Sequence, residues 1–220
     1  MMSTDWGAAE AGFVLAGGQS SRMGRDKALA LFGGRPLIGL AVSMLRGAGI
    51  EAAIAGARSD LSVFAPVVED QEPGTEKGPL AGICAGLAAT PAERAVFVSV
   101  DLPLLPGALI VAMLEHARIT GQAVTVVSVN GFAQTFPVVL DRAVLPELER
   151  RLHSGQRGCF AAIEAAAEVR GESVSVLPVE VLVQSGQVEH PSALPAAWWF
   201  LNVNSSADLE RAEEIARASG

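Results

Sequence analysis

A glycine-rich segment near the N-terminus carries the residue types that bind phosphate. Residues 15–27 combine glycines with hydroxyl and cationic side chains, among them Gly17, Gly18, Gly24, Ser20, Ser21, Arg22 and Lys27. Glycine lets backbone N–H groups approach an anion closely, because no Cβ intervenes, and nests of such N–H groups bind anions. The segment therefore predicts a phosphate site. The alternative is a glycine-rich turn with solvated charges, which accounts poorly for the whole string.

This segment differs from two familiar phosphate loops. No Gly-Lys-Ser/Thr follows at the Walker spacing, and Gly-x-Gly-x-x-Gly is absent. The glycines follow a short apolar run at residues 12–16, which predicts a buried strand that leads into the loop. Open α/β sheets bind ligands outside the carboxyl ends of their strands, so we expect the anion there.

A carboxylate at a second strand end is the candidate metal ligand. Residues 95–100 form an apolar, β-branched run that ends at Asp101. Mg²⁺ binds one or two carboxylates together with phosphate oxygens and water, so Asp101 is enough to recruit it once a nucleotide is bound. An Asp that only caps the next helix is the alternative. Asp70 follows another short apolar run and is the second acidic candidate, with Glu69 as its competitor and a solvated loop acid as the alternative.

The elements that position these residues alternate along the chain. Apolar runs predict strands at residues 12–16, 52–55, 67–68, 95–100, 123–129, 136–140, 173–177 and 197–202. Helical spacing predicts helices at residues 36–48, 79–89, 105–118, 142–152, 158–167 and from a cap at Ser205 or Ser206 to about Ala216. This order predicts an α/β fold, a Rossmann-like three-layer sandwich with a mostly parallel sheet and residues 12–16 at its centre.

Length and composition favour one globular domain. The chain has 220 residues, of which 50% are hydrophobic and 18% charged, so a disordered chain is excluded. We expect a tail at residues 1–11 and a single domain at residues 12–220, with residues 183–195 as a loop or surface insert. The formal net charge is −8 and no basic tract occurs, so we expect no nucleic-acid partner.

The cysteines and the N-terminal residues favour a reducing compartment. Cys84 and Cys159 lie far apart in the sequence without the spacing of a zinc motif or a disulfide framework, and Cys84 is expected to be a small core residue. No window of 18 uncharged apolar residues occurs, so no membrane span is expected. Residues 1–10 carry Asp5 and Glu10 without a basic region, unlike a signal peptide. We expect a cytoplasmic protein.

Four segments together resemble a known family. Residues 15–27 are similar to Leu-Ala-Gly-Gly-x-Ser-x-Arg-Met-Gly-x-Asp-Lys, the N-terminal signature of the molybdenum cofactor guanylyltransferases, which belong to the nucleotide-sugar-pyrophosphorylase-like nucleotidyltransferases. Residues 78–82, 98–103 and 202–209 resemble three further family segments, in the same order and spacing. The resemblance covers most of residues 12–216 and implies the nucleotide-diphospho-sugar transferase type of sandwich.

The resemblance also implies an activity. It implies transfer of GMP from GTP to the phosphate of molybdopterin, with Mg²⁺ as cofactor, pyrophosphate as leaving group and a guanine dinucleotide cofactor as product. Apo-molybdoenzymes that receive this product are further implied partners. The implied catalytic residues are Lys27, Arg22 and Asp101, with Asp101 on the metal. The implied nucleotide-binding residues are Leu15, Ala16, Gly17, Gly18, Lys27, Asp70, Pro79, Leu80 and Asp101, and the implied pterin-side residues are Asn202 and Asn204.

Several alternative interpretations of the function and of single residues remain open. The chain could be a cytidylyltransferase acting on molybdopterin or another phosphorylated metabolite, a sugar-1-phosphate nucleotidyltransferase, or a scaffold that binds nucleotide or cofactor without turnover. Asn202 and Asn204 could instead bond turn backbone. Trp198 and Trp199 could stack on a pterin, although core packing is the commoner role. His116, His153 and His190 show no partner pattern and are expected to be surface or packing residues.

Gly17 bears on the choice of nucleotide. Related cytidylyltransferases read Leu-Ala-Ala-Gly where this chain has Leu-Ala-Gly-Gly. A glycine leaves room for a purine that an alanine methyl would fill, so the sequence predicts GTP over CTP. The alternative is that Gly17 only allows a positive φ.

The chain departs from the family pattern in two places. Residues 53–58 lack an Asn that helps to hold the nucleotide in some members, and residues 171–198 are longer than in the family, so no residue role is transferred there.

Overall fold

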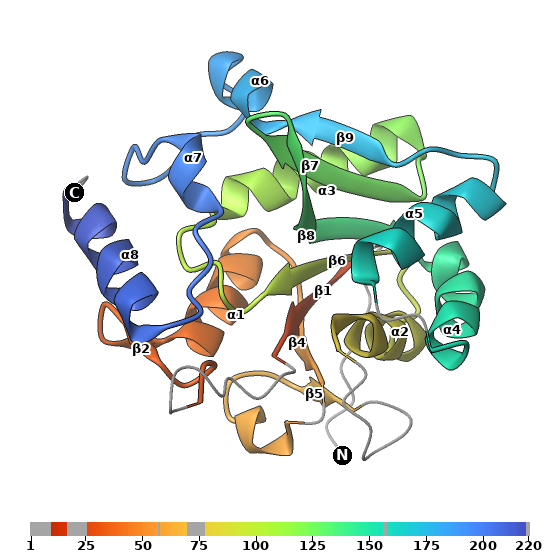
Figure 1. Ribbon diagram of the computed structural model, residues 1–220, viewed down its shortest axis with the longest axis horizontal. Coiled ribbons are helices and arrows are strands. Elements are labelled where there is room, and N and C mark those ends of the chain that lie inside the picture. Colours follow the sequence, from red (N-terminus) through yellow and green to blue (C-terminus); the bar gives the residue numbers. More distant parts are fainter. Residues whose placement is uncertain (1–9, 17–25, 57, 70–77, 156–157, 219–220) are drawn as a thin grey trace.

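The computed structural model describes residues 10–16, 26–56, 58–69, 78–155 and 158–218 (Figure 1). Its strands are β1 Glu10–Leu15, β2 Leu31–Phe32, β3 Arg35–Pro36, β4 Ala52–Ala55, β5 Val67–Val68, β6 Arg94–Ser99, β7 Val124–Val129, β8 Phe132–Asp141 and β9 Ser175–Pro178. Its α-helices are α1 Leu37–Gly47, α2 Pro79–Ala89, α3 Gly107–Thr120, α4 Leu145–His153, α5 Cys159–Val169, α6 Val179–Gln184, α7 Ala196–Trp199 and α8 Ser206–Ala218, with 3₁₀ turns η1 Ser59–Leu61 and η2 Arg142–Val144.

Seven strands form one twisted sheet in the order β5-β4-β1-β6-β8-β7-β9. The pairs β4–β5, β1–β4, β1–β6 and β7–β9 are parallel, whereas β8 runs antiparallel to both β6 and β7. The predicted α/β fold with a mostly parallel sheet and a central first strand is therefore confirmed. β1 begins at Glu10 because Glu10 and Ala11 already pair with Arg94 and Ala95. The division into an N-terminal tail and a single domain stays a prediction.

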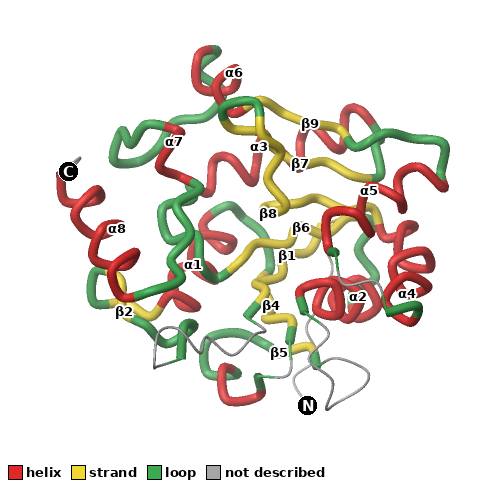
Figure 2. The backbone as a smooth tube through the Cα atoms, viewed as in Figure 1, coloured by secondary structure: helices red, strands yellow, loops and turns green. Residues whose placement is uncertain are grey.

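Helices cover both faces of the sheet, which makes the three layers. Figure 2 shows the sheet between two sets of helices. One core lies under α1, α3, α7 and α8 and contains Val14, Val96 and Val98 from the sheet, and the other lies under α2, α4 and α5 and contains Phe13 and Phe97. Alternate residues of β1 and β6 thus face opposite cores, as strands covered on both sides require.

Helix α2 packs close to the sheet because it is built from small residues. Phe13 and Phe97 stack beneath it with ring centroids 5.2 Å apart. A Cβ added at Gly86 would lie 2.8 Å from Phe97 Cε1 and 3.1 Å from Phe13 Cγ. Gly86 therefore sets the approach of α2 to β1 and β6, and the helix propensity lost at this glycine is offset by aromatic packing.

Gly86→Ala is expected to lower the free energy of unfolding by about 1–3 kcal/mol, because overpacking shifts either the helix or the two rings. Gly47→Ala is the matched control, since a Cβ there has no neighbour within 4 Å. The control is expected to be neutral or to stabilise by up to about 1 kcal/mol through helix propensity. Chemical denaturation of both variants measures the difference. Equal stabilities would contradict the close packing of α2.

One predicted strand is wrong. Residues 197–202 were expected to be a strand, but Ala196–Trp199 form the short helix α7. Trp199 is buried in the first core and its Nε1 donates to the Leu194 carbonyl over 2.8 Å. The apolar run therefore reflects the burial of one face of a short helix. In so short a run, the sequence pattern of a buried helix and that of a strand look the same. Residues 183–195 are loop only after α6 ends at Gln184.

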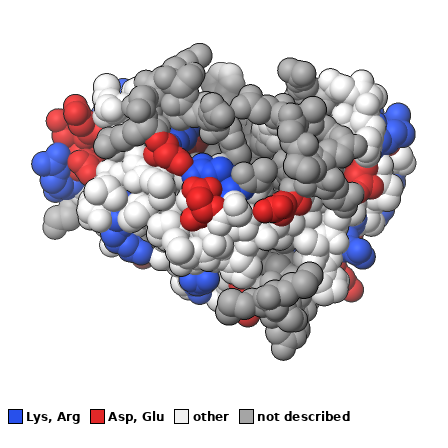
Figure 3. All heavy atoms as spheres, turned by 90° about the horizontal axis from the view of Figure 1, so that it is seen from below, with Lys and Arg blue, Asp and Glu red and all other residues white. Residues whose placement is uncertain are grey.

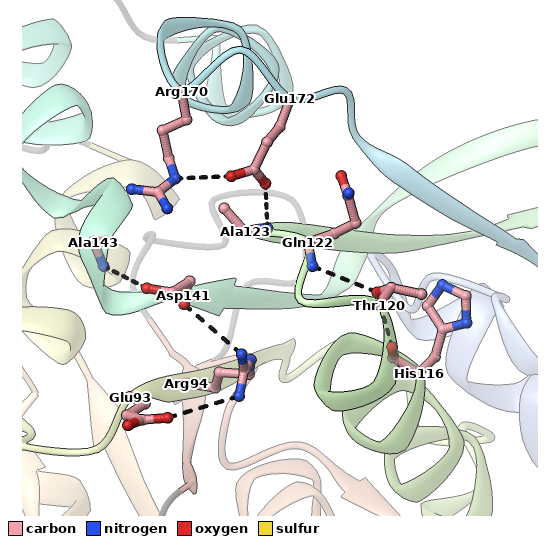
Figure 4. Close-up of polar contacts among 10 residues, drawn as sticks. All are labelled: Glu93, Arg94, His116, Thr120, Gln122, Ala123, Asp141, Ala143, Arg170 and Glu172. Carbon is pink, nitrogen blue, oxygen red and sulfur yellow. Dashed lines mark hydrogen bonds and ion pairs between the residues drawn. The ribbon is translucent and has the colours of Figure 1, made fainter.

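Polar contacts hold the amino-terminal edge of the sheet together (Figure 4). Glu172 accepts a hydrogen bond from the Ala123 backbone N–H over 2.7 Å and pairs with Arg170 at 3.2 Å. Arg94 lies 4.0 Å from Asp141, whose carboxylate also accepts from the Ala143 N–H. Acidic and basic groups largely compensate one another at this edge.

The opposite edge holds a topological switch point. From β1 the chain turns to β4 on one side, and β6 joins β1 on the other. The Val100 N–H donates to the Leu15 carbonyl over 3.3 Å, so the carboxyl ends of β1 and β6 lie side by side. Open α/β sheets bind ligands where strand order reverses in this way. Within the described part, none of the helices is long and apolar enough to cross a bilayer.

Candidate functional site

Three side chains from distant parts of the chain meet at the switch point. Lys27 Nζ lies 2.9 Å from Asp101 Oδ2 and 2.7 Å from Asn204 Oδ1. The Lys27 and Asp101 side chains are 17% and 16% exposed, so water reaches the ion pair only in part. We call Lys27, Asp101 and Asn204 the charge triad. The structure thus brings together the end of the glycine-rich segment, the end of β6 and the start of the last helix.

Backbone contacts bring Asn204 to this place. The Val203 N–H donates to the Asp101 carbonyl over 3.0 Å, which ties the C-terminal segment to the end of β6. Ser205 Oγ accepts from the Asp208 N–H, and Asp208 Oδ2 accepts from the Asn204 N–H and the Ser205 hydroxyl. These reciprocal bonds cap α8, confirm Ser205 as a helix cap, and lower the pKa of Asp208, chiefly through the Ser205 hydroxyl.

The oxygens of the triad suit a hard divalent cation. Asp101 Oδ1 is buried and has no hydrogen-bond partner among the described residues, while Oδ2 is bonded to Lys27. A buried carboxylate oxygen without a partner is unfavourable, and binding a cation would satisfy it. A carboxylate and an amide carbonyl are ligands of the kind that Mg²⁺ takes beside phosphate and water. No cluster of three His, Cys, Asp or Glu suited to a metal occurs in the described part of the chain.

The residues predicted on the nucleotide side fall into two groups. Leu15 ends β1 with its side chain in the core, and the Ala16 N–H donates to the Ala55 carbonyl over 3.4 Å. Pro79 begins α2 and is exposed, whereas Leu80 is fully buried. Gly78 before them has φ +70° and ψ −167°, a conformation that favours glycine. Gly17, Gly18, Arg22 and Asp70 lie outside the described residues.

The two asparagines differ in their contacts. Asn204 reaches Lys27, as a site residue would. Asn202 is exposed, and its Nδ2 donates to the Phe200 carbonyl over 3.4 Å. The structure therefore places Asn204, and not Asn202, in the charge triad.

The aromatic and histidine residues set aside earlier have packing roles. Trp199 is core, and Trp198 lies under Arg211, whose Cζ is 5.4 Å from the ring centroid. His190 accepts a bond from the Ser192 N–H and contacts both the Leu104 carbonyl and the Trp199 ring, and burial lowers its pKa. Cys84 is buried, as expected.

Sequence reasoning missed one ion-pair cluster beside the site. Arg58 follows β4 and pairs with Asp26, the residue before Lys27, and with Asp60. These two carboxylates raise the pKa of Arg58, the Asp60 hydrogen bond most strongly, and Arg58 in turn lowers the pKa of Asp60. The signal was a set of charges directly after a predicted strand end, in the region where the family Asn is missing.

On the face shown in Figure 3, basic and acidic atoms of the described residues lie side by side near the centre. Within the charge triad, Lys27 is the cation that a phosphate would meet.

Comparison with known proteins points to one family. A family model described as MobA-like NTP transferase domain matches residues 12–172. A molybdenum cofactor guanylyltransferase from Cereibacter sphaeroides is 32% identical over 217 residues, which cover 94% of this chain and 96% of that protein. One from Sinorhizobium fredii is 31% identical over 209 residues, which cover 91% and 89%.

A solved structure shares the fold. It is molybdopterin-guanine dinucleotide biosynthesis protein A from Archaeoglobus fulgidus, with a TM-score of 0.74 and 21% identity, and the match covers 95% of this chain and 99% of that one. At this identity the likeness shows the fold alone.

Proposed function

Because the chain belongs to the family of MobA-like NTP transferase domains, we propose that it transfers GMP from GTP to the phosphate of molybdopterin. The protein is a nucleotidyltransferase of molybdenum cofactor biosynthesis, as its curated relatives are. The proposal goes further and names the reaction: a guanine dinucleotide cofactor forms and pyrophosphate leaves. The observation that carries it is the charge triad at the switch point, with a buried, unpartnered Asp101 oxygen.

The chemistry needs charge neutralisation more than acid–base catalysis. A terminal phosphate oxygen of the acceptor attacks the α-phosphorus of the nucleotide; the new P–O bond forms as the bond to the β-phosphate oxygen breaks. Positioning and electrostatic stabilisation carry most of such a transfer. Lys27, Arg22 and backbone N–H groups of the glycine-rich loop that follows β1 would hold the triphosphate, and the Lys27 ammonium would neutralise charge on the departing pyrophosphate.

Asp101 would hold Mg²⁺, with the Asn204 carbonyl oxygen as a neighbouring donor. When bound, the metal supplies positive charge that stabilises the transition state at phosphorus. Lys27 is paired with Asp101 Oδ2 in this structure, and we expect its ammonium to shift toward the phosphates when the nucleotide binds. Asp70, Pro79 and Leu80 stay proposed nucleotide contacts, and Asn202 and Asn204 stay proposed contacts on the pterin side.

The proposal includes a location and partners. Cys84 and Cys159 form no disulfide, which fits a reducing compartment, and we propose the cytoplasm. Apo-molybdoenzymes are the proposed recipients of the product, with no role for nucleic acid or a membrane.

Pyrophosphate release tests this function. Purified protein, Mg²⁺ and molybdopterin are incubated in parallel with GTP, CTP, ATP and UTP. Release with GTP, dependent on molybdopterin, is the expected result. Release only with CTP would assign the chain to the cytidylyl reaction, release only with a sugar 1-phosphate as acceptor would assign it to sugar nucleotides, and nucleotide binding without release would favour a scaffold.

Gly17→Ala is expected to weaken GTP binding more than CTP binding, because the added methyl occupies room that a purine needs. Competition binding of both nucleotides to the wild type and the variant measures this, with GTP expected to bind the wild type better. Equal losses would leave Gly17 only a backbone role, and a wild type that prefers CTP would overturn the guanylyl assignment.

A further inference from the structure

We infer that Arg58 is a positioning residue for nucleotidyl transfer, which acts through Asp26 to hold Lys27 at the carboxyl ends of β1 and β6. The inference rests on the proposed function and adds a residue to it. Arg58 touches neither Asp101 nor Asn204 in any contact of the described residues. Its effect would be transmitted through the segment that carries Lys27.

The geometry of the pair fixes Asp26 with respect to the sheet. Arg58 Nη1 lies 3.3 Å from Asp26 Oδ1, and Nη2 contacts Oδ2, so the guanidinium donates a hydrogen bond to each carboxylate oxygen. Planar two-point pairing of this kind fixes orientation as well as distance. Arg58 is itself anchored two residues after Gly56, whose N–H donates to the Val68 carbonyl of β5.

Asp26 in turn constrains the backbone around Lys27. Asp26 Oδ1 also accepts a hydrogen bond from the Ala28 N–H over 2.9 Å, which closes a turn around Lys27. The Ile38 N–H donates to the Ala28 carbonyl over 3.0 Å, which ties the other end of the turn to α1. The backbone of Lys27 is therefore held from β4 on one side and from α1 on the other, and its long side chain alone is left to reach Asp101.

A second acidic group keeps Arg58 in place. Asp60 accepts from Arg58 Nε over 2.9 Å and from Nη2 over 2.7 Å. Asp60 is more exposed than Asp26, with 56% of its side chain accessible against 34%. The more exposed Asp60 carboxylate thus orients the Arg58 guanidinium, which donates its other hydrogen bonds to the less exposed Asp26 carboxylate. Arg58 also pairs with the negative charge of Asp26, the residue directly before Lys27.

Arg58→Met tests the inference, with Arg150→Met as the matched control. Arg150 also makes a bidentate pair, with Glu147 on α4: Nε lies 2.8 Å from Oε2 and Nη2 lies 2.6 Å from Oε1. Helix α4 carries none of the proposed site residues. Steady-state kinetics with GTP are measured for both, with thermal unfolding alongside. Arg58→Met is expected to lower kcat/KM about 10- to 100-fold, the scale of a small misplacement at a reacting centre, and Arg150→Met to leave it unchanged.

Hydrogen exchange gives a readout that does not depend on turnover. In Arg58→Met the Ala28 amide is expected to exchange faster than in the wild type and in Arg150→Met, because Asp26 is no longer held. The exchange rate of the Ala28 amide in Arg58→Lys is expected to lie between the rates in the wild type and in Arg58→Met, since an ammonium does not reproduce the bidentate pair. If exchange at Ala28 and kcat/KM both stay at wild-type values in Arg58→Met, Arg58 has no positioning role.

Two further backgrounds separate positioning from general stability. In the Lys27→Met background, Arg58→Met is expected to reduce kcat/KM by less than about twofold, because residues that act through one another are not additive. Asp26→Asn keeps an acceptor for Ala28 but removes the charge, and adding Arg58→Met to it is expected to cost little more. Full additivity in both cycles would overturn the inference. A wild type without GTP-dependent release would instead overturn the proposed function.

Discussion

Asp101→Ala is expected to lower the metal-dependent rate of nucleotidyl transfer by about 10²–10³-fold, the loss typical of one preorganised electrostatic contact. The buried Oδ1 has no partner among the described residues, so removing the carboxylate costs the fold chiefly the pair between Oδ2 and Lys27, up to about 1 kcal/mol for a partly exposed pair. Asp101→Asn is expected to lose nearly as much rate, because it keeps the shape but not the charge. Pyrophosphate release at varied Mg²⁺ concentration measures both variants.

Asp141→Asn serves as the control for Asp101. Asp141 stands at the opposite edge of the sheet, where it bonds the Ala143 N–H and lies near Arg94. The rate constant of the Asp141→Asn variant is expected to stay at the wild-type value even if the melting temperature of the variant falls. Should Asp101→Ala retain a near-wild-type rate with Mg²⁺, another carboxylate must hold the metal, and Asp70 is the first to test.

Lys27→Met is expected to change two affinities in opposite directions. Binding of the metal–nucleotide complex and the rate of transfer should both fall, the rate by about 10²–10³-fold, because a cation that meets the phosphates is lost. Binding of Mn²⁺ to the nucleotide-free protein should instead tighten. Lys27 occupies Asp101 Oδ2 in this structure, and releasing a partly exposed pair of up to about 1 kcal/mol corresponds to roughly fivefold.

Titration calorimetry with Mn²⁺ alone, and then with GTP and Mg²⁺, separates these effects. The nucleotide-free measurement reports on the competition between ammonium and metal for one carboxylate, whatever the acceptor is. An unchanged or weaker Mn²⁺ affinity in Lys27→Met would show that Lys27 does not exclude the metal. Arg35→Met, which removes an exposed cation bonded to Ser43, controls for the loss of one positive charge.

Strands and helices were predictable where an apolar run ends at a glycine, a proline or a charge. Residues 52–55, 67–68 and 79–89 have the predicted bounds of β4, β5 and α2. For β4 the reason is burial along the whole strand, which leaves an uninterrupted apolar run. The neighbours of residues 136–140 in the sheet were not predictable. These residues belong to β8, which pairs with β7 and also with β6 and so lies between the two strands, a long-range arrangement that no local pattern encodes.

One missed element did carry a signal. Gly33 and Gly34 have φ values of +56° and +77° and connect β2 to β3 in a two-residue hairpin. A Gly-Gly pair between short apolar runs is a known signal for such a turn. The runs here are two residues each, too short to show alternation, which is why the hairpin was not predicted.

The site was predictable in its parts but not in its connections. The glycine-rich segment located Lys27, a strand end located Asp101 and the C-terminal motif located Asn204, yet only the fold shows that one ammonium bonds both. The pair between Arg58 and Asp26 likewise depends on how the loop after β4 meets the segment before Lys27. Such contacts follow from tertiary positions, so residue types at a strand end indicate a candidate and not its partner.

The bond between Lys27 and Asn204 also sets an order of events during synthesis. Lys27 and Asp101 can pair once β1 and β6 have been made, but Asn204 follows Asp101 by roughly 100 residues. At about 5–20 residues per second, the nascent chain spends about 5–20 s with the lysine held by the carboxylate alone. The Val203 N–H, which bonds the Asp101 carbonyl, arrives in the same last stretch. The ribosome therefore delivers the amide of the charge triad roughly 100 residues after the carboxylate.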